Sequence, residues 1–286
     1  MSTSKSRLMW IDVSSSDDQR LYISVDQVYV RKRTKFQDLW IVELADFGKS
    51  LFLDGEWQSS VKNEFYYHEC LVHPAFVCHA EPKSVLILGG GEGATIREAL
   101  KWKSVEQIAM VDIDGELVTE CKRYLPEMHQ GSFDSPKVTL IIQDAVDYIN
   151  NSKSKWDIII SDLTSPSEFG LADRLYSQEY LQKCCELLTP EGFFVIQSGS
   201  SQIFSLGGHA KLASRIRSVF KDSLSYANID GWTFIMASNK KIKFPNSHKK
   251  IDLILEAQLS AKTKSLDGSA ILGMFSLPKH FRDAIN

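Results

Sequence analysis

Four acidic residues in the middle of the chain follow separate apolar runs, each at or just past the end of its run: Glu92, Asp112, Asp144 and Asp162. Parallel strands bring their carboxyl ends to one edge of a sheet, so we expect these carboxylates to ring one cleft. One acid after a strand is more often a helix cap, but four in order indicate a site for an amine or polycation. Magnesium is possible on ligand type alone. Because no set of His and Cys ligands accompanies the acids, we predict no metal.

A glycine-rich turn follows the apolar run Val85–Leu88 and contains Gly89, Gly91 and Glu92. Glycines at a strand-to-helix junction permit a tight turn and let a nucleotide approach the backbone. A pyrophosphate would meet the Glu92 carboxylate at short range, whereas a cation would be stabilised by it. The turn therefore disfavours NAD and favours a positively charged adenosyl compound. Two alternatives to a ligand site are open. The glycines could be needed only for packing of the helix on the sheet, and Glu92 could serve only to interact with the helix dipole.

Two further features belong to the same predicted cleft. Asp112 lies about 20 residues beyond Gly91, the spacing at which an acid accepts hydrogen bonds from a ribose. A polar stretch follows Asp162 and continues to Arg174. Its length suits a lid over the cleft, or equally a surface excursion, and its composition does not distinguish the two.

The elements that would position these residues alternate between strands and helices. Nearly continuous apolar strands that alternate with helices indicate a parallel sheet covered on both faces, an α/β fold. The predicted strands are 84–88, 107–111, 138–142, 156–160, 193–197 and 232–238. After Lys240 the chain has a Lys-rich linker and helical residues near 251–259, whose role the sequence does not indicate.

The N-terminal part has a different pattern, with short β-branched and aromatic runs between residues 20 and 60. Turn candidates at Phe47–Lys49 and at Asp54-Gly55 separate these runs and indicate antiparallel hairpins. Such a module buries little by itself and must pack on something larger. We therefore predict a β-hairpin domain over 1–68, with 1–18 loose, and a Rossmann-like domain with a C-terminal tail over 69–286.

Composition narrows the class of protein. The chain has 286 residues, with 33 Lys and Arg against 36 Asp and Glu, a net charge of −3. This balance gives no excess of positive charge that would attract nucleic acid. No apolar run approaches the length of a membrane span. The start of the sequence lacks the apolar region of a secretory signal. The five cysteines lack CxxC spacing and indicate reduced thiols. We expect a cytoplasmic protein that binds neither nucleic acid nor membrane.

Taken together, the motifs resemble the spermidine synthase family of polyamine aminopropyltransferases. The resemblance spans about Leu21 to Ser238, in matching order and spacing. The motifs are DGEWQSSVKNEFYYHE (54–69), GGGEGATIRE (89–98), VDID (111–114), QDA (143–145) and DLTSP (162–166). Together with YHE-x-LVHPA (67–75), the glycine-rich motif is most similar to the thermospermine and triamine synthase branch.

This resemblance implies a methyltransferase-like, doubly wound catalytic domain behind the small β-domain, usually in a homodimer or homotetramer. It implies transfer of an aminopropyl group from decarboxylated S-adenosylmethionine, a co-substrate, to a di- or polyamine. Methylthioadenosine is released and no prosthetic group is needed.

Site residues follow from the same resemblance. On the donor side, Gly89 and Gly91 form the nucleoside loop, Gln37 and Asp112 hold the ribose region, Asp144 and Ala145 meet the adenine, and Glu92 holds the aminopropyl ammonium. On the acceptor side, Asp162 is the catalytic acid, and the other contacts are Gln58, Tyr67, His68, Ser165 and Gln197. Without the resemblance, Tyr67 and His68 would be assigned to helix packing. Trp57, Trp102 and Trp232 are expected in the core.

Two departures from the family lie on the acceptor side. Ser165 stands where the family usually has a second acid, and 226–232 lacks the usual insertion with an amine-contacting tyrosine. Two other functions stay open, the first because it shares the fold and the second because of these departures. One is an S-adenosylmethionine-dependent small-molecule methyltransferase, and the other is a catalytically impaired, polyamine-binding homologue.

Overall fold

The computed structural model describes residues 9–13, 21–163, 171–201 and 206–285. Five antiparallel strands in sequence order form the first sheet: β1 (Met9–Asp12), β2 (Tyr22–Arg33), β3 (Asp38–Leu44), β4 (Gly48–Leu53) and β5 (Glu56–Ser60). The predicted hairpin turn at Asp54-Gly55 is confirmed, with φ of 50° and 84° at its two residues. Positive φ at both positions suits the right-handed twist of the flanking strands.

Strand β1 corrects the prediction that 1–18 is loose. Met9–Asp12 pairs with β2, because Met9 and Ile11 alternate with exposed residues and pack against the cluster that contains Val25 and Phe52. Residues 1–8 and 14–18 lie outside the described part. The first sheet ends at Ser60 and the next helix begins at Phe65, and the domain boundary at residue 68 stays a prediction.

The second sheet has seven strands in the order β11-β12-β10-β9-β6-β7-β8. Its strands are β6 (Ser84–Gly89), β7 (Gln107–Asp112), β8 (Val138–Ile142), β9 (Trp156–Asp162), β10 (Leu188–Ser200), β11 (Asp222–Ala227) and β12 (Trp232–Ser238). The pairs from β10 to β8 are parallel, which confirms the predicted α/β sheet. Strand β11 was missed, because its residues are only half buried, and both β11 and β12 pair in the antiparallel sense.

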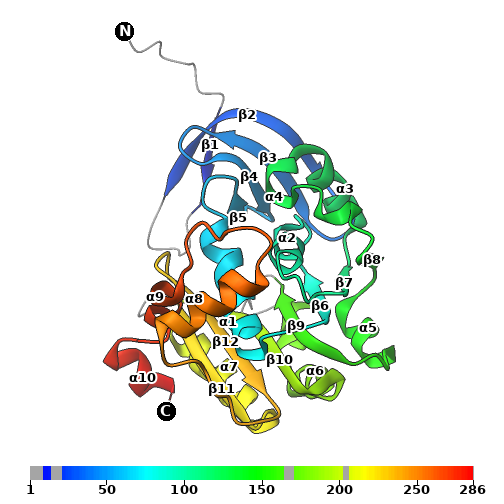
Figure 1. Cartoon of the computed structure of the whole chain (residues 1–286). Helices are drawn as coiled ribbons and strands as arrows, with labels where there is room; N and C mark the ends of the chain where they lie inside the picture. The colour runs from blue at the N-terminus through cyan, green and yellow to red at the C-terminus, as the bar shows by residue number, and fades with distance from the viewer. Residues whose placement is uncertain (1–8, 14–20, 164–170, 202–205, 286) are drawn as a thin grey trace.

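Helices cover both faces of this sheet (Figure 1). They are α1 (Phe65–His79), α2 (Ala94–Leu100), α3 (Gly115–Tyr124), α4 (Pro126–His129), α5 (Ala145–Asn151), α6 (Gln178–Leu187), α7 (Leu206–Val219), α8 (His248–Gln258), α9 (Gly268–Met274) and α10 (Lys279–Ile285), with 3₁₀ turns η1 (Ser132–Asp134) and η2 (Leu171–Tyr176). One apolar cluster joins the sheet to α1, α2, α8 and α9, and another joins it to α5, α6 and α7. Within the described residues, no helix is long and apolar enough to cross a membrane.

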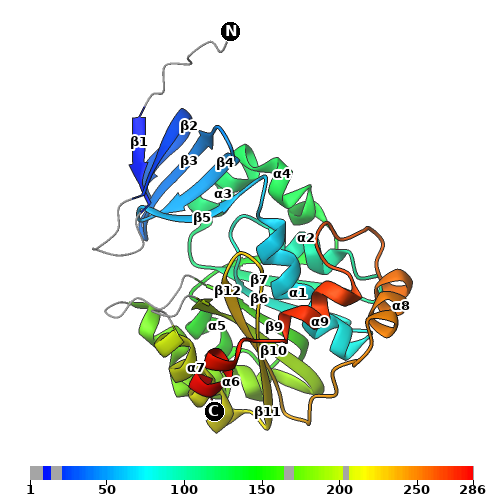
Figure 2. The same ribbon diagram turned by 90° about the vertical axis from the view of Figure 1, so that its left-hand side faces the viewer.

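Helix α10 of the C-terminal tail packs against α7, whereas the part of the tail that includes α8 and α9 packs with α1 and α2 (Figure 2). The fully buried Glu69 of α1 holds it there by accepting backbone hydrogen bonds from Lys264, Ser265 and Leu266. The tail therefore completes the cover of the sheet, which is a role the sequence did not indicate.

The first sheet lies over α3 and α4, as Figures 1 and 2 show from two sides. Leu39, Ile41, Leu51 and Leu53 form one cluster with apolar residues of these helices, including Leu117. This packing places the β4–β5 hairpin next to the carboxyl ends of the second sheet, so that a cavity is enclosed between the two.

Candidate active site

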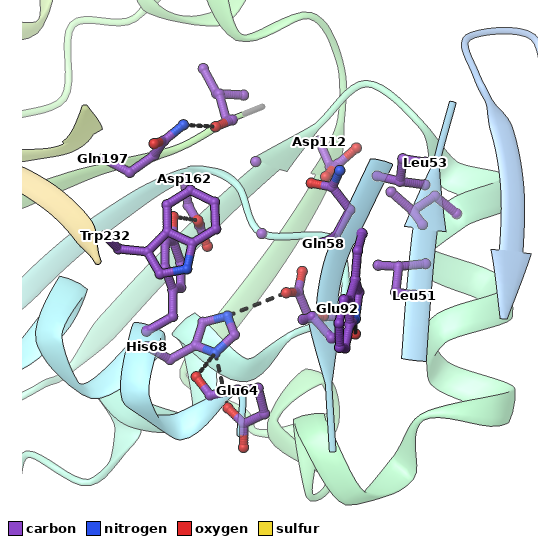
Figure 3. Close-up of a pocket in the computed structure, with 18 of the residues that line it drawn as sticks. Leu51, Leu53, Gln58, Glu64, His68, Glu92, Asp112, Asp162, Gln197 and Trp232 are labelled. Carbon is purple, nitrogen blue, oxygen red and sulfur yellow. Dashed lines mark hydrogen bonds and ion pairs between the residues drawn. The ribbon is translucent and has the colours of Figure 1, made fainter. Parts of the chain in front are cut away.

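A cavity of about 460 Å³ lies between the β4–β5 hairpin and the carboxyl ends of β6, β7 and β9. Most of the predicted site residues line it: Gln37, Gln58, Tyr67, His68, Gly89, Gly91, Glu92, Asp112, Asp162 and Gln197. Figure 3 shows Glu92, Asp112 and Asp162 in this one pocket although they come from separate strand ends. The predicted convergence of carboxylates is therefore confirmed for these three acids.

The fourth acid, Asp144, does not lie with the other three. Asp144 and Ala145 are absent from the cavity lining as far as the chain is described. The Asp144 carboxylate caps α5 by accepting the N–H of Val146, and its other oxygen pairs with Arg174. The reason is strand order, since β8 is the edge strand and is separated from β6 by β7. Ser165 and most of the predicted lid lie outside the described residues.

Several cavity residues were missed from the sequence. Trp57 and Trp232 are half-buried residues that pack against apolar clusters, as expected, but also line the cavity, whereas Trp102 is fully buried. Glu64 and Asp230 also line it. Glu64 could have been found from its position one helical turn before His68, where the two side chains share a face.

The glycine turn brings the loops after β6 and β9 into contact. Gly89 has φ of 86°, and a Cβ there would lie 2.1 Å from the backbone oxygen of Asp162. The next residue, Gly90, donates its N–H to that oxygen at 3.1 Å. Only glycine fits this approach. Glu92 and Asp162 are consequently brought into the same pocket.

The Asp162 carboxylate is held from two sides. Tyr67 donates its hydroxyl to Oδ1 at 2.8 Å, and Thr95 donates to Oδ2 at 2.5 Å. The Tyr67 ring meets the edge of Trp232 with centroids 5.4 Å apart. Burial and then the charge of Glu92 raise the pKa of Asp162 above its usual value. The site therefore presents an oriented carboxylate with increased proton affinity.

His68 lies between two carboxylates (Figure 3). Its Nδ1 lies 2.9 Å from Glu64 Oε2, and its Nε2 lies 3.2 Å from Glu92 Oε1. Burial alone would lower the pKa of His68, but the two carboxylates outweigh burial and raise the pKa to about 10. Burial likewise opposes ionisation of Glu92, yet contact with His68 holds its pKa below the usual value. His68 is thus an imidazolium and Glu92 a carboxylate at neutral pH.

The pKa of Asp112 is shifted in the opposite direction to that of Glu92. Burial raises its pKa to about 7, with further repulsion from Asp114 and Glu92, although an N–H from Asp114 partly offsets both. Gln37 donates its side-chain amide to Asp114 Oδ2 at 2.9 Å, so Gln37 and Asp112 meet through the first turn of α3. The carboxylate of Asp112 is therefore destabilised while no ligand donates to it.

The remaining wall is polar and aromatic. Gln197 donates to the Leu163 carbonyl at 3.1 Å and accepts the N–H of Gly199 at 3.0 Å. Gln58 donates to the Glu56 carbonyl at 3.2 Å. A cavity with this wall and five acidic lining residues suits a ligand that carries several positive charges on an apolar body.

Comparisons with known proteins agree with the motifs. The spermine/spermidine synthase domain model matches residues 64–245, and the spermidine synthase tetramerisation domain model matches residues 9–60. A polyamine aminopropyltransferase of Synechococcus sp. (strain JA-2-3B'a(2-13)) is 42% identical over 274 residues, which are 92% of this chain and 88% of that protein. The enzyme of that name from Aeropyrum pernix is 40% identical over 269 residues, 91% and 85% of the two chains.

Solved structures are similar over nearly the whole chain. A spermidine synthase in complex with the transition-state analogue AdoDATO superposes with a TM-score of 0.87 at 27% identity, covering 97% of this chain and 95% of the other. The spermidine synthase from Thermotoga maritima gives 0.85 at 27% identity, with 96% and 93% covered.

Proposed function

This chain belongs to the spermidine synthase family, and we propose on that premise that it is a polyamine aminopropyltransferase. It moves an aminopropyl group from decarboxylated S-adenosylmethionine to a di- or polyamine and releases methylthioadenosine. The observation that carries this assignment is the cavity in which Glu92, Asp112 and Asp162 converge. A sulfonium donor with a terminal ammonium and an amine acceptor both match this charge.

The reaction follows from the chemistry of the two substrates. The lone pair of the acceptor nitrogen attacks the methylene next to the sulfonium, a C–N bond forms, and the C–S bond breaks with its electron pair on sulfur. Sulfur leaves as a neutral thioether, so the protein mainly has to align the reactants, an effect worth up to about 7–11 kcal/mol. The acceptor is protonated near neutral pH, as the lysine reference pKa of about 10.4 indicates. We propose that Asp162 takes that proton while Tyr67 orients the nitrogen.

On the donor side, we propose that Glu92 binds the aminopropyl ammonium while Gly89 and Gly91 contact the nucleoside. For Gln37 and Asp112 we propose contacts to the ribose, which would supply Asp112 with donors in addition to the N–H of Asp114. The contacts of Asp144 and Ala145 with the adenine stay predictions, since both residues lie outside the cavity lining.

On the acceptor side, His68, Gln58 and Gln197 are proposed wall contacts. Ser165 stays a prediction outside the described residues. The departures at Ser165 and 226–232 lie on the acceptor side, so they bear on which amine is used and on the level of activity. Membership of the thermospermine and triamine branch is likewise a proposal that rests on motif form.

We propose that the protein is a homodimer or homotetramer. The match of residues 9–60 to a tetramerisation domain supports self-association, and analytical ultracentrifugation would give the number of subunits. The cytoplasmic location stays a prediction based on the free cysteines.

The test is a product assay with decarboxylated donor and a panel of putrescine, agmatine, cadaverine and spermidine. We expect an aminopropylated amine, detected by mass spectrometry, in equal amount to methylthioadenosine. Reactions without acceptor and with intact S-adenosylmethionine are the controls, and calorimetry should show tighter binding of the decarboxylated donor. A methylated product would identify a methyltransferase, and amine binding without turnover would identify an impaired homologue.

A further inference from the structure

A chain of four charged residues connects the cavity to the buried interior behind it. In order from the interior, this charge chain consists of Arg97, Glu64, His68 and Glu92. Arg97 donates both terminal nitrogens to the two oxygens of Glu64, at 3.0 and 2.8 Å. Glu64 contacts Nδ1 of His68, and the Nε2 of the same ring contacts Glu92. The signs of the charges alternate along the whole chain.

The inner members of the charge chain are too deeply buried to serve as surface ion pairs. Glu64 and His68 have side chains 1% exposed and Arg97 is 7% exposed, whereas Glu92, at the cavity wall, is 14% exposed. Two charge-assisted hydrogen bonds in a fork fix Glu64 in one plane. The Nδ1 atom of His68 lies 2.8 Å from the backbone oxygen of Glu64 and 2.9 Å from its carboxylate, and the other ring nitrogen faces Glu92.

We propose that Glu64 and Arg97 are positioning residues of the aminopropyl transfer, which act through His68 to keep Glu92 ionised and aimed at the donor's ammonium. This inference rests on the proposed function and adds Glu64, which lies at the cavity wall, and Arg97, which lies behind it. Without the imidazolium, burial and the other acids would favour a protonated Glu92, which binds a cation poorly.

The charges around His68 come from every element packed against it. Glu64 precedes α1 as its N-cap and Tyr67 lies on α1. Arg97 and Glu98 lie on α2 and Glu92 on the glycine turn. Asp112 lies at the end of β7 and Asp162 at the end of β9. His68 lowers the pKa of both Glu92 and Asp162, so its charge favours the ionised form of each. If His68 becomes neutral, both carboxylates should therefore protonate at a higher pH.

The decisive variant is Glu64→Gln. It keeps the shape of the side chain but removes the charge that holds the proton on His68. We expect the KM for the decarboxylated donor to rise by about ten- to a hundredfold, with a smaller fall in kcat. The acid limb of the pH profile of kcat/KM should move upward by about one unit. Arg97→Lys keeps the charge without the fork and should give an intermediate effect.

Glu69→Gln is the matched control, because Glu69 is a fully buried glutamate on the same helix that bonds the C-terminal tail instead of the cavity. It should lower thermal stability without changing the donor KM or the pH profile. A merely structural role for Glu64 would produce this same pattern in Glu64→Gln and would overturn the inference.

A measurement on the unmodified protein keeps the inference testable if Glu64→Gln does not fold. Nitrogen NMR of isotope-labelled histidine, assigned with His68→Asn, should show the His68 ring doubly protonated well above its ordinary pKa. Titration of this ring near about pH 6.5 would overturn the inference even if the protein transfers aminopropyl groups. Absence of transfer in the unmodified protein would instead contradict the proposed function.

Discussion

At the scale of single residues, Asp162 combines two properties that a general base needs. Its orientation is fixed by Tyr67 and Thr95, and burial together with Glu92 raises its pKa toward the working range. A base whose pKa approaches the ambient pH transfers protons efficiently. The same carboxylate would be a weaker base at a solvated surface.

Asp162→Asn should lower kcat by about 10²–10⁴, because the amide keeps the shape but does not accept the ammonium proton. Binding of the decarboxylated donor, measured by calorimetry, should change little. Asp157→Asn is the control, since Asp157 lies on the same strand but bonds the backbone of Lys83 and Ser84. Near-normal turnover of Asp162→Asn would rule out the proposed base.

Part of this site could be predicted from residue types alone. Glu92, Asp112 and Asp162 follow strands that lie side by side in the sheet, so the rule that ligands bind at strand ends located them. Asp144 lies outside the cavity lining, at the end of the edge strand β8, and its contact with the adenine stays a prediction. Trp232 was missed because an aromatic residue in a strand is most often core, and its edge contact with Tyr67 is a tertiary feature.

At the scale of elements, the glycine turn is the junction on which the site depends. Gly89 allows β6 and β9 to end in contact, which brings the Glu92 loop next to Asp162. The ends of β6 and β9 therefore both depend on the absence of a side chain at residue 89. A side chain there would displace Glu92 and Asp162 together.

Gly89→Ala should lower activity strongly and destabilise the fold. Its positive φ alone costs about 1–3 kcal/mol for a residue with a Cβ, and the clash with the Asp162 backbone adds to this. Gly207→Ala in α7 is the control, because a Cβ there meets nothing within 4 Å. Thermal denaturation and the transfer assay should show a large loss for the first variant and none for the second. Unchanged activity in Gly89→Ala would contradict the role of the turn.

Elements with strong periodicity or long apolar runs were predictable, including the five parallel strands and the Asp54-Gly55 hairpin. The missed strands share a physical cause. β1 and β11 are edge strands with half-buried residues, so their hydrophobic signal is weak. The antiparallel direction of β12 could not be predicted either, because it depends on the short hairpin that β11 forms with it.

At the scale of the whole molecule, the cavity brings several carboxylates close together. Their mutual repulsion lowers the stability of the unliganded fold, and the same carboxylates are available to bind a cationic ligand. Burial raises the pKa of Asp112 to about 7, above its ordinary value of 3.8. A carboxyl with a raised folded-state pKa stabilises the fold while it is protonated. That contribution is present below the ordinary pKa and is lost as pH rises through about 7.

Asp112→Asn should therefore stabilise the unliganded protein by about 1–4 kcal/mol near pH 8 and by little near pH 4. It should also weaken donor binding, since the ribose loses a charged acceptor. Denaturant unfolding at several pH values measures the gain, and Asp134→Asn is the control, because that side chain is 74% exposed. A gain that does not depend on pH would contradict the assigned pKa.

The anchoring of the tail by Glu69 has a practical consequence for preparing shortened versions of this protein. The matched catalytic domain stops at residue 245, yet the three N–H donors for Glu69 come from residues 264–266. A version trimmed to the domain limit would leave the buried Glu69 without these three donors, with only the ion pair to Lys101 at 3.9 Å among its described partners. Purification tags are therefore better placed at the amino end, and the tail should be kept through α10, because Ile271 and Phe281 are buried as well.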